Sequence, residues 1–191
     1  MSINKGISAN DGSKKARIER AALELFAQDG IDHTTTKAIA KLANVSEGLI
    51  YRHFKNKEAL AQHLMRTIHT KLTDIISSVG ELNDLGAQIR LITSEYCEIA
   101  DKDWLLFRYH ILNLHRFPNL SENNPLDETR KILESAMARG EIPTEDAAIL
   151  ASMSLGVVLQ TAQAKVLGFI QGSLSDHLDL FVRRIEALVD L

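Results

Sequence analysis

The chain has 191 residues, of which 45% are hydrophobic and 25% charged, a composition typical of a soluble globular protein. Its single cysteine cannot form a disulfide within the chain, which excludes a disulfide-stapled secreted scaffold. The formal net charge is −3, but residues 1–60 carry +3 and residues 61–191 carry −6. A basic N-terminal part favours a polyanionic partner for that part of the chain.

Neither a signal peptide nor a membrane span is expected. Residues 1–13 are polar and contain no apolar core. The stretch 147–164 is uncharged but holds five polar residues, namely Ser152, Ser154, Gln160, Thr161 and Gln163. Their presence favours a buried helix of a soluble protein over a membrane span. We therefore expect a cytoplasmic protein without membrane contact.

The pattern of apolar residues predicts an all-α fold, because they recur at helical spacing and no alternating strand pattern is found. A first helix is expected over 14–29, with Gly30 at its end, where a positive φ is favoured. Three short helices then follow, each preceded by a residue whose side-chain oxygen can cap it: Thr35 or Thr36, Ser46 and Asn56. Longer helices are expected over 83–100, 103–116, 125–139, 145–167 and 174–189. We expect a small domain over 12–60 and a larger helical domain over 61–191.

Residues 34–60 have the layout of a helix-turn-helix. Two short helices are joined by a turn at 43–45, and Asn44 occupies the turn position that favours a positive φ. The apolar contacts between the two helices are expected from Ile39, Val45 and Ile50. The same pattern also occurs in helical proteins that do not bind DNA.

The outer face of the second helix carries groups that can bind DNA. These residues are Ser46, Tyr51, Arg52 and His53. Their hydroxyl, guanidinium and imidazole groups can donate hydrogen bonds to phosphates, and the arginine can also recognise guanine. Gly48 lets the helix backbone approach DNA closely. Thr36, Lys37 and Lys57 lie at the starts of the neighbouring helices, where free amide groups favour a phosphate.

Residues 23–60, LELFAQDGIDHTTTKAIAKLANVSEGLIYRHFKNKEAL, resemble the tetracycline-repressor (TetR/AcrR) family of bacterial transcription regulators. The resemblance covers about a fifth of the chain, and these positions fall at the family's spacing: Leu25, Phe26, Gly30, Thr36, Ile39, Ala40, Val45, Ser46, Tyr51, Phe54, Lys57 and Leu60. The sequence departs from the family pattern at Asn44, where glycine is commoner, and at Glu47, an acidic residue at the start of the second helix.

The resemblance implies a homodimer in which each N-terminal domain reads one half-site of a palindromic operator in double-stranded DNA. By position, Thr36 and Lys37 would contact phosphates. The bases would be approached by Ser46, Glu47, Gly48 and Leu49, and the backbone or adjacent bases by Tyr51, Arg52, His53 and Lys57. Glu47 either accepts a hydrogen bond from cytosine or only stabilises the first turn of its helix.

The resemblance also implies a small hydrophobic effector that binds in the helical body. The helix over 103–116 is apolar nearly all round, so we expect it to form a pocket wall with these residues: Trp104, Phe107, Tyr109, His110, Ile111 and Leu114. The alternative is that these side chains are ordinary core. The connection 117–124 forms either an entrance to the pocket or a surface turn.

A dimer interface is expected on the last two helices. Ala148, Ser152 and Gly156 recur at intervals of four, which lets another helix approach closely, and Phe181 and Ile185 lie on the apolar stripe of the last helix. Packing within one subunit is the competing explanation.

No catalytic, cofactor or metal motif is found in the sequence. HExxH, CxxC, GxSxG and phosphate-loop patterns are missing, and His110 and His115 diverge on a helix. The sequence therefore predicts a ligand-responsive repressor that needs no cofactor. The alternatives are a DNA-bound protein-interaction factor without an effector, and an enzyme that carries a helix-turn-helix.

Overall fold

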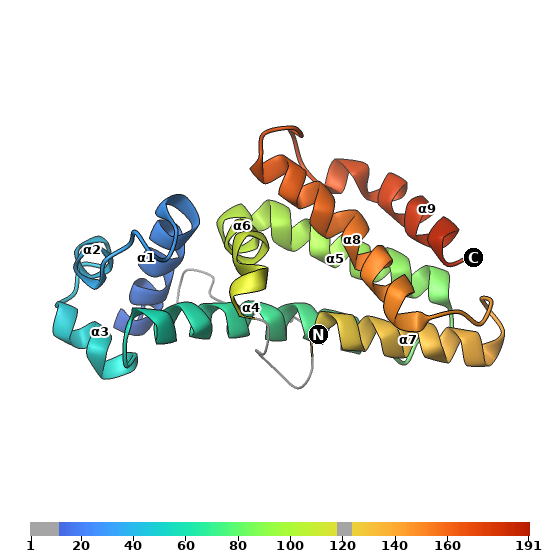
Figure 1. The fold of residues 1–191 in the computed structure, drawn as a ribbon, viewed down its shortest axis with the longest axis horizontal. Coiled ribbons are helices and arrows are strands. Elements are labelled where there is room, and N and C mark those ends of the chain that lie inside the picture. Colours follow the sequence, from blue (N-terminus) through green and yellow to red (C-terminus); the bar gives the residue numbers. More distant parts are fainter. Residues whose placement is uncertain (1–11, 118–123) are drawn as a thin grey trace. The chain divides into compact units, whose positions relative to one another are not determined.

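The computed structural model describes residues 12–117 and 124–191, and within these residues every regular element is a helix (Figure 1). The all-α prediction is therefore confirmed. The elements are α1 (Lys14–Asp29), α2 (Thr36–Leu42), α3 (Glu47–His53), α4 (Lys57–Ser78), α5 (Leu85–Lys102), α6 (Trp104–Asn113), η1 (Leu114–Arg116), α7 (Pro125–Arg139), α8 (Ala147–Val166), η2 (Ser175–His177) and α9 (Leu178–Leu188). Most of the connection expected at 117–124, including Pro118, lies outside the described residues.

Two of the predicted caps are confirmed. The Thr35 side chain accepts a hydrogen bond from the amide of Ala38 (3.1 Å), and the Asn56 side chain accepts one from the amide of Ala59 (2.7 Å). Ser46 precedes α3 with extended backbone, but its side chain makes no capping hydrogen bond within the described residues. Ser46 is exposed.

The helices form two compact units. Unit 1 contains residues 12–68 and 105–117 of the described chain, and unit 2 contains residues 69–104 and 124–191. This division differs from the predicted boundary at residue 60, because the first half of α4 and nearly all of α6 belong with α1, α2 and α3.

Unit 1 has a closely packed core in which α6 takes a central place. The ring of Tyr109 on α6 stacks on Phe26 of α1, with centroids 6.1 Å apart, and its hydroxyl donates to the carbonyl of Ala61 on α4 (2.8 Å). Tyr109 and Phe107 are both fully buried. Burying aromatic side chains of this size supplies much of the hydrophobic stabilisation of a small domain. The helix therefore fixes α1 to α4.

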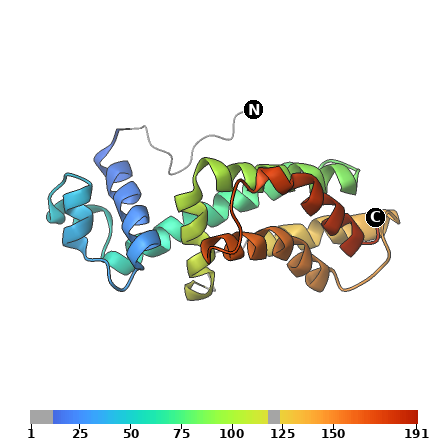
Figure 2. The ribbon, with the colours of Figure 1, turned by 90° about the horizontal axis from the view of Figure 1, so that it is seen from above.

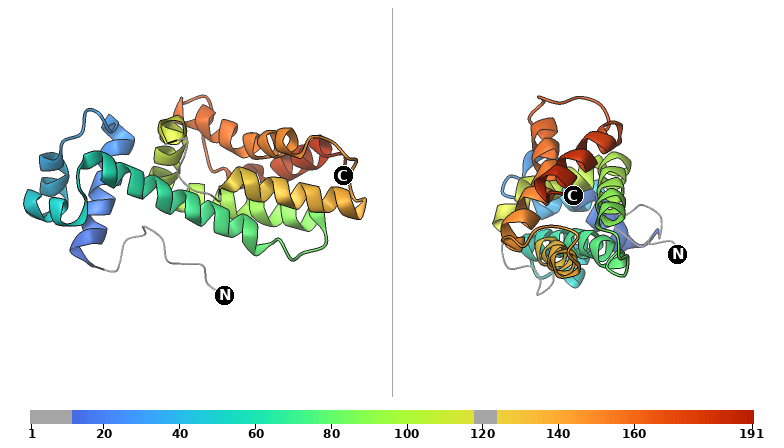
Figure 3. Two further views of the ribbon diagram at one scale, coloured as in Figure 1. Left: turned by 60° about the horizontal axis from the view of Figure 1, so that its bottom comes forward. Right: turned by 90° about the vertical axis from the view of Figure 1, so that its right-hand side faces the viewer.

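Unit 2 is built from α5, α7, α8 and α9 together with the second half of α4. Contacts join α8 to α7 and α9, and α5 to α9 and α7, so the four helices enclose a common core (Figures 2 and 3). Asp101 near the end of α5 receives hydrogen bonds from the chain around η2, which positions the start of α9.

Helix α8 is long and apolar enough to cross a membrane by length and composition alone, and only 33% of its 18-residue window is buried. Its outer face carries Ile149, 58% exposed, and Met153, 45% exposed. Ala148 and Ser152 are exposed on the same face, and a Cβ added to Gly156 would meet nothing within 4 Å. The small residues of the predicted interface thus lie on an open, apolar helix face.

Phe181 and Ile185 lie on the apolar stripe of the last helix, as the sequence predicts. Both are on α9 and both are buried within the chain, with 4% and 6% of their surfaces exposed. Because α9 is strongly amphipathic, its apolar stripe packs onto α5 and α8 of the same chain. These two side chains therefore contribute to the core of unit 2, and their place in a dimer interface stays a prediction.

Candidate nucleic-acid interface

The α2–turn–α3 segment is held rigidly from its inner side. Asn44 has φ 52°, as the sequence predicts, and the guanidinium of Arg17 on α1 donates to its carbonyl (2.6 Å). The amide of Val45 donates to the carbonyl of Ala40 (3.0 Å), which closes the turn. Ile39 and Ile50 are fully buried on the facing sides of α2 and α3. The packing leaves the other face of α3 free.

The exposed face of α3 carries the side chains that the sequence singles out. Tyr51 is 51% exposed, and Ser46, Arg52 and His53 are also exposed. Gly48 lies between them, and a Cβ added there would meet nothing within 4 Å. Packing within the chain therefore does not require glycine at this position. The helix backbone at Gly48 is therefore open to close approach from outside.

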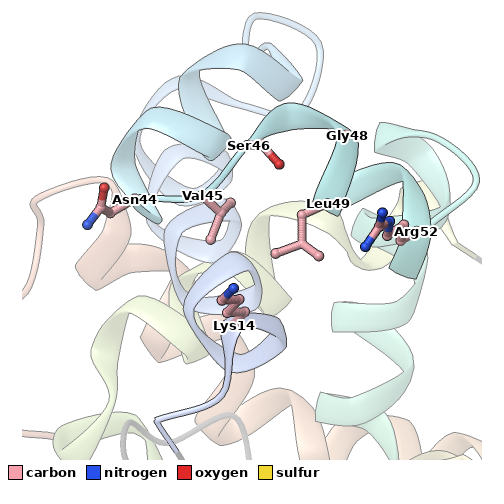
Figure 4. A pocket seen from close by; sticks show the side chains of 7 residues that line it. All are labelled: Lys14, Asn44, Val45, Ser46, Gly48, Leu49 and Arg52. Carbon is pink, nitrogen blue, oxygen red and sulfur yellow. The ribbon is translucent and has the colours of Figure 1, made fainter.

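A hollow beside α3 is bordered by cations (Figure 4). Figure 4 shows Lys14 and Arg52 on its two sides, with the Ser46 hydroxyl and the open backbone of Gly48 along α3. The full lining is Lys14, Asn44, Val45, Ser46, Gly48, Leu49 and Arg52. None of these lining residues is acidic, so the hollow favours an anion such as a phosphate. Lys14 could not be assigned to this surface from the sequence, because it lies 30 residues before Asn44 and reaches the hollow only through the fold.

Thr36 and Glu47 form a link between α2 and α3. The hydroxyl of Thr36 donates to Glu47 Oε1 (2.5 Å) and lies 3.2 Å from the hydroxyl of Tyr51. Glu47 stands in the first turn of α3, where a negative charge is favourable, and it also fixes the angle between the two helices. With its side chain engaged in this way, the group of Thr36 best placed for a phosphate is its backbone amide at the start of α2.

Lys57 and Lys37 have different surroundings. The ammonium of Lys57 donates to the carbonyls of Thr34 (2.7 Å) and Asp32 (3.2 Å), which uses two of its three hydrogens and ties the α1–α2 connection to α4. Lys37 on α2 is exposed. Removing Lys57 would therefore alter the local structure as well as the charge, so Arg52 is the better residue for a binding test.

The residues expected to line an effector pocket are divided between the two units. Phe107, Tyr109, His110 and Ile111 are buried in unit 1, and Leu114 is 37% exposed on η1. Trp104 belongs to unit 2, where the ammonium of Lys165 lies 4.5 Å from the centre of its ring. The apolar residues around α6 therefore reflect the burial of this helix in the protein core. The hollow that unit 2 contains is lined by other residues, described below.

Within residues 12–117 and 124–191, no group of three or more His, Cys, Asp or Glu side chains could hold a metal ion.

The fold and this interface define a helix-turn-helix protein with a larger helical body. Residues 18–64 match the family model described as "Bacterial regulatory proteins, tetR family". A probable HTH-type transcriptional regulator, ArpR of Pseudomonas putida, is 36% identical over 89 residues, which cover 45% of this chain and 42% of the relative. The matched region thus spans less than half of that relative's length.

Solved structures extend the likeness in fold to more than nine tenths of the chain. The fatty acid degradation regulator FadR of Bacillus halodurans has a TM-score of 0.77 at 20% identity, over 93% of this chain and 99% of that one. FadR of Bacillus subtilis, solved in complex with stearoyl-CoA, has a TM-score of 0.76 at 23% identity, over 92% and 97%. Residues 18–64 thus form a DNA-binding domain of the TetR type, and the chain as a whole shares the fold of these solved regulators.

Proposed function

We propose that the protein is a cytoplasmic repressor that binds a palindromic operator as a homodimer and is released by a small hydrophobic effector. The observation that carries the DNA-binding part is the outer face of α3. That face presents an open glycine backbone at Gly48, flanked by the exposed donors of Ser46, Tyr51 and Arg52 and by the cationic hollow. A helix with these groups along one side fits the major groove and the adjacent phosphates.

The dimer is supported by the outer face of α8. Helix α8 contains an 18-residue window without acidic or basic residues, and only a third of this window is buried in the chain. The helix therefore exposes a large apolar surface to water. Ile149 and Met153 dominate that face, and the small residues Ala148, Ser152 and Gly156 would let a second helix approach. Two copies related by a twofold axis would cover this surface and place two α3 helices for two half-sites.

The effector is supported by the helical body and by its structural neighbours. FadR of Bacillus subtilis, which shares this fold, was solved with stearoyl-CoA, a ligand with a long apolar chain. An effector releases DNA only as far as it binds the released state more tightly than the DNA-bound state. The proposal therefore requires a ligand site in the body whose occupancy changes operator affinity.

The test is a titration of the purified protein against labelled DNA from directly upstream of its own gene, read by fluorescence anisotropy. We expect saturable binding, two chains per site, and an affinity far above that for scrambled DNA. Arg52→Ala should weaken operator binding by about tenfold to a hundredfold, as expected for loss of a base or phosphate contact. Arg66→Ala is the matched control, because Arg66 is an exposed arginine of unit 1 on α4.

Equal losses in Arg52→Ala and Arg66→Ala would show that only net charge matters and would refute the assigned interface. The salt dependence adds a second readout, because each phosphate contact removed lowers the slope of log affinity against log salt by about 0.9. Operator binding by a monomer would refute the dimer.

A second candidate function is a DNA-bound factor that docks another protein and has no effector. It is favoured by the connection after α8, where Leu167 is 63% exposed and Phe169 is 81% exposed. Exposed apolar side chains this close together are typical of a contact surface. Phe169→Ser separates the two candidates: loss of regulation with intact operator binding and intact effector response would favour docking.

A further inference from the structure

Unit 2 contains an apolar hollow of about 40 Å³ among four of its helices. Its wall is formed by Ile89, Ile92, Thr93 and Tyr96 of α5, Thr129 of α7, Ser154, Leu155 and Val158 of α8, and Ile185 of α9. Ile92 and Leu155 are partly exposed, so the hollow reaches the surface, while most of the other lining side chains are buried. By volume it holds about three water-sized groups, which suits the end of a narrow molecule.

Two hydroxyl groups in this wall have no hydrogen-bond partner among the described residues. They belong to Tyr96, 2% exposed, and Ser154, 7% exposed. The wall also contains two threonines, Thr93 and Thr129, and the hydroxyl of Thr129 already donates to the carbonyl of Pro125 (2.8 Å). A buried hydroxyl without a partner costs free energy, so such groups in a native protein call for an occupant. Two of them in one hollow, from different helices, point to the same occupant.

The chemistry of the wall selects the class of molecule. No lining residue carries a charge, so an ionised ligand would lose its hydration without gaining a counter-charge. Both free groups can donate, and a carbonyl oxygen has two lone pairs with which to accept. The remaining wall is aliphatic and accommodates a narrow hydrocarbon chain.

We propose that this hollow binds the effector, and that the effector is an uncharged aliphatic molecule whose carbonyl oxygen accepts hydrogen bonds from Tyr96 and Ser154. This inference rests on the proposed ligand-responsive function. It places the site on α5, α7, α8 and α9 and not on α6. Helices α8 and α9 then both contact the ligand, and α8 also carries the exposed apolar face on its opposite side.

The experiment uses methyl ketones from 2-butanone to 2-nonanone as probes, and the carboxylate of matching length as the charged comparison. Binding is measured by the NMR shifts of isoleucine methyl groups, with Ile89, Ile92 and Ile185 as reporters in the wall. We expect one ketone length to bind best and to do so about tenfold or more above its carboxylate. Tyr96→Phe and Ser154→Ala should each weaken ketone binding by about tenfold, because each removes one donor.

Tyr109→Phe is the matched control, because the hydroxyl of Tyr109 is paired with the carbonyl of Ala61 in unit 1. It should lower the melting temperature and leave ketone binding unchanged. Tyr96→Phe should leave the melting temperature unchanged or raise it, because it removes a hydroxyl that has no partner. A clear loss of stability in Tyr96→Phe would show that its hydroxyl has a structural partner and would overturn the proposal.

Three other results would overturn it: no saturable ketone binding up to the solubility limit, unchanged binding in both hydroxyl variants, or preference for the carboxylate. Operator affinity is measured with and without ketone in the same samples. Ketone binding that leaves operator affinity unchanged overturns the effector role assigned to the hollow. If the protein binds no operator even without ketone, the proposed function is refuted instead. The measurement without ketone thus distinguishes failure of the proposed function from failure of the proposed effector site.

Discussion

Arg116 and Asp32 form a bidentate ion pair, in which Nη1 and Nη2 of the guanidinium donate hydrogen bonds of 2.8 and 2.7 Å to the two carboxylate oxygens. It also donates to the carboxylate of Glu58 in the first turn of α4 (3.1 and 3.2 Å). The hydrogen bond from Arg116 lowers the pKa of Asp32, and the two carboxylates raise the pKa of the guanidinium. η1 is thus fastened both to the α1–α2 connection and to α4, next to the helix-turn-helix.

We expect Arg116→Ala to loosen this connection without unfolding unit 1. Amide hydrogen exchange should become faster in residues 31–36, and operator affinity should fall because α2 is less well positioned. Hydrogen-exchange mass spectrometry and anisotropy measure the two effects. Arg130→Ala on α7 is the control, because Arg130 pairs with Glu134 on the surface of the same helix. Unchanged exchange in residues 31–36 would show that the ion cluster has no structural role.

The Arg116 contact should also depend on pH. The pKa of Asp32 is lowered in the folded chain, so the contact contributes stability above the ordinary pKa of 3.8 and loses it as the pH falls through the lowered value. The difference in melting temperature between the protein and Arg116→Ala should therefore be constant near neutral pH and shrink below pH 3.8. Thermal unfolding across this range measures it, and a difference that grows on acidification contradicts the assignment.

Gly48→Ala separates folding from DNA binding. Because nothing lies within 4 Å of the added Cβ, the change should stabilise α3 by about 0.5–1 kcal/mol through helix propensity. On DNA, the same methyl group stands between the helix backbone and the groove, so operator affinity should fall. Urea unfolding and anisotropy measure the two quantities, and Gln62→Ala on the exposed side of α4 is the control. A variant that is more stable and binds the operator normally would show that α3 does not approach DNA at Gly48.

Local features of the fold could be read from the sequence, since they depend on neighbouring residues. Thr35 and Asn56 cap the helices that follow them, and Asn44 takes the positive φ that its turn requires. These are interactions over three or four residues, in which residue type alone determines the preference. The sequence also predicts a cap at Ser46, but the side chain of Ser46 makes no capping hydrogen bond within the described residues.

Features set by long-range packing could not be read in this way. The apolar pattern of α6 shows that the helix is buried, but it does not show that Tyr109 packs on Phe26 in unit 1. The unpaired hydroxyls of Tyr96 and Ser154 belong to helices 58 residues apart in sequence, and only the fold brings them to one hollow. Lys14 reaches the α3 surface for the same reason. Residue type predicts which side of α3 is exposed and polar, and three-dimensional packing determines what surrounds that side.

Gly156→Leu tests the α8 face. The site is open in the single chain, so a leucine should leave the stability of the subunit nearly unchanged. Between two closely approaching helices it would separate the backbones, so the dimer dissociation constant should rise by about tenfold or more. Sedimentation velocity measures the dimer, and operator affinity should fall in parallel. Gln62→Leu adds the same side chain to an exposed position of unit 1, and a similar loss of dimer there would argue against a specific role for α8.

Asp101 fixes the start of the last helical segment, and its replacement tests how unit 2 is held together. Its carboxylate accepts hydrogen bonds from the amides of Leu174 (2.9 Å) and Ser175 (2.9 Å), from the hydroxyl of Ser175 (2.6 Å), and from the hydroxyl of Ser173. Burial raises the pKa of Asp101, but these hydrogen bonds outweigh it and bring the pKa to about 2. Asp101→Asn keeps the size and loses the charge, so we expect a destabilisation of about 1–2 kcal/mol at neutral pH.

The pH dependence of this effect follows from the lowered pKa. The stability contributed by the Asp101 carboxylate is present above its ordinary pKa of 3.8 and is lost as the pH falls towards about 2. Urea unfolding of the protein and of Asp101→Asn should therefore give curves that are well separated at neutral pH and converge below pH 3.8. Asp179→Asn is the control, because Asp179 is 79% exposed and its pair with Arg90 should contribute less than about 1 kcal/mol. A constant separation down to the lowest pH would show that the hydrogen bonds to Asp101 do not depend on its charge.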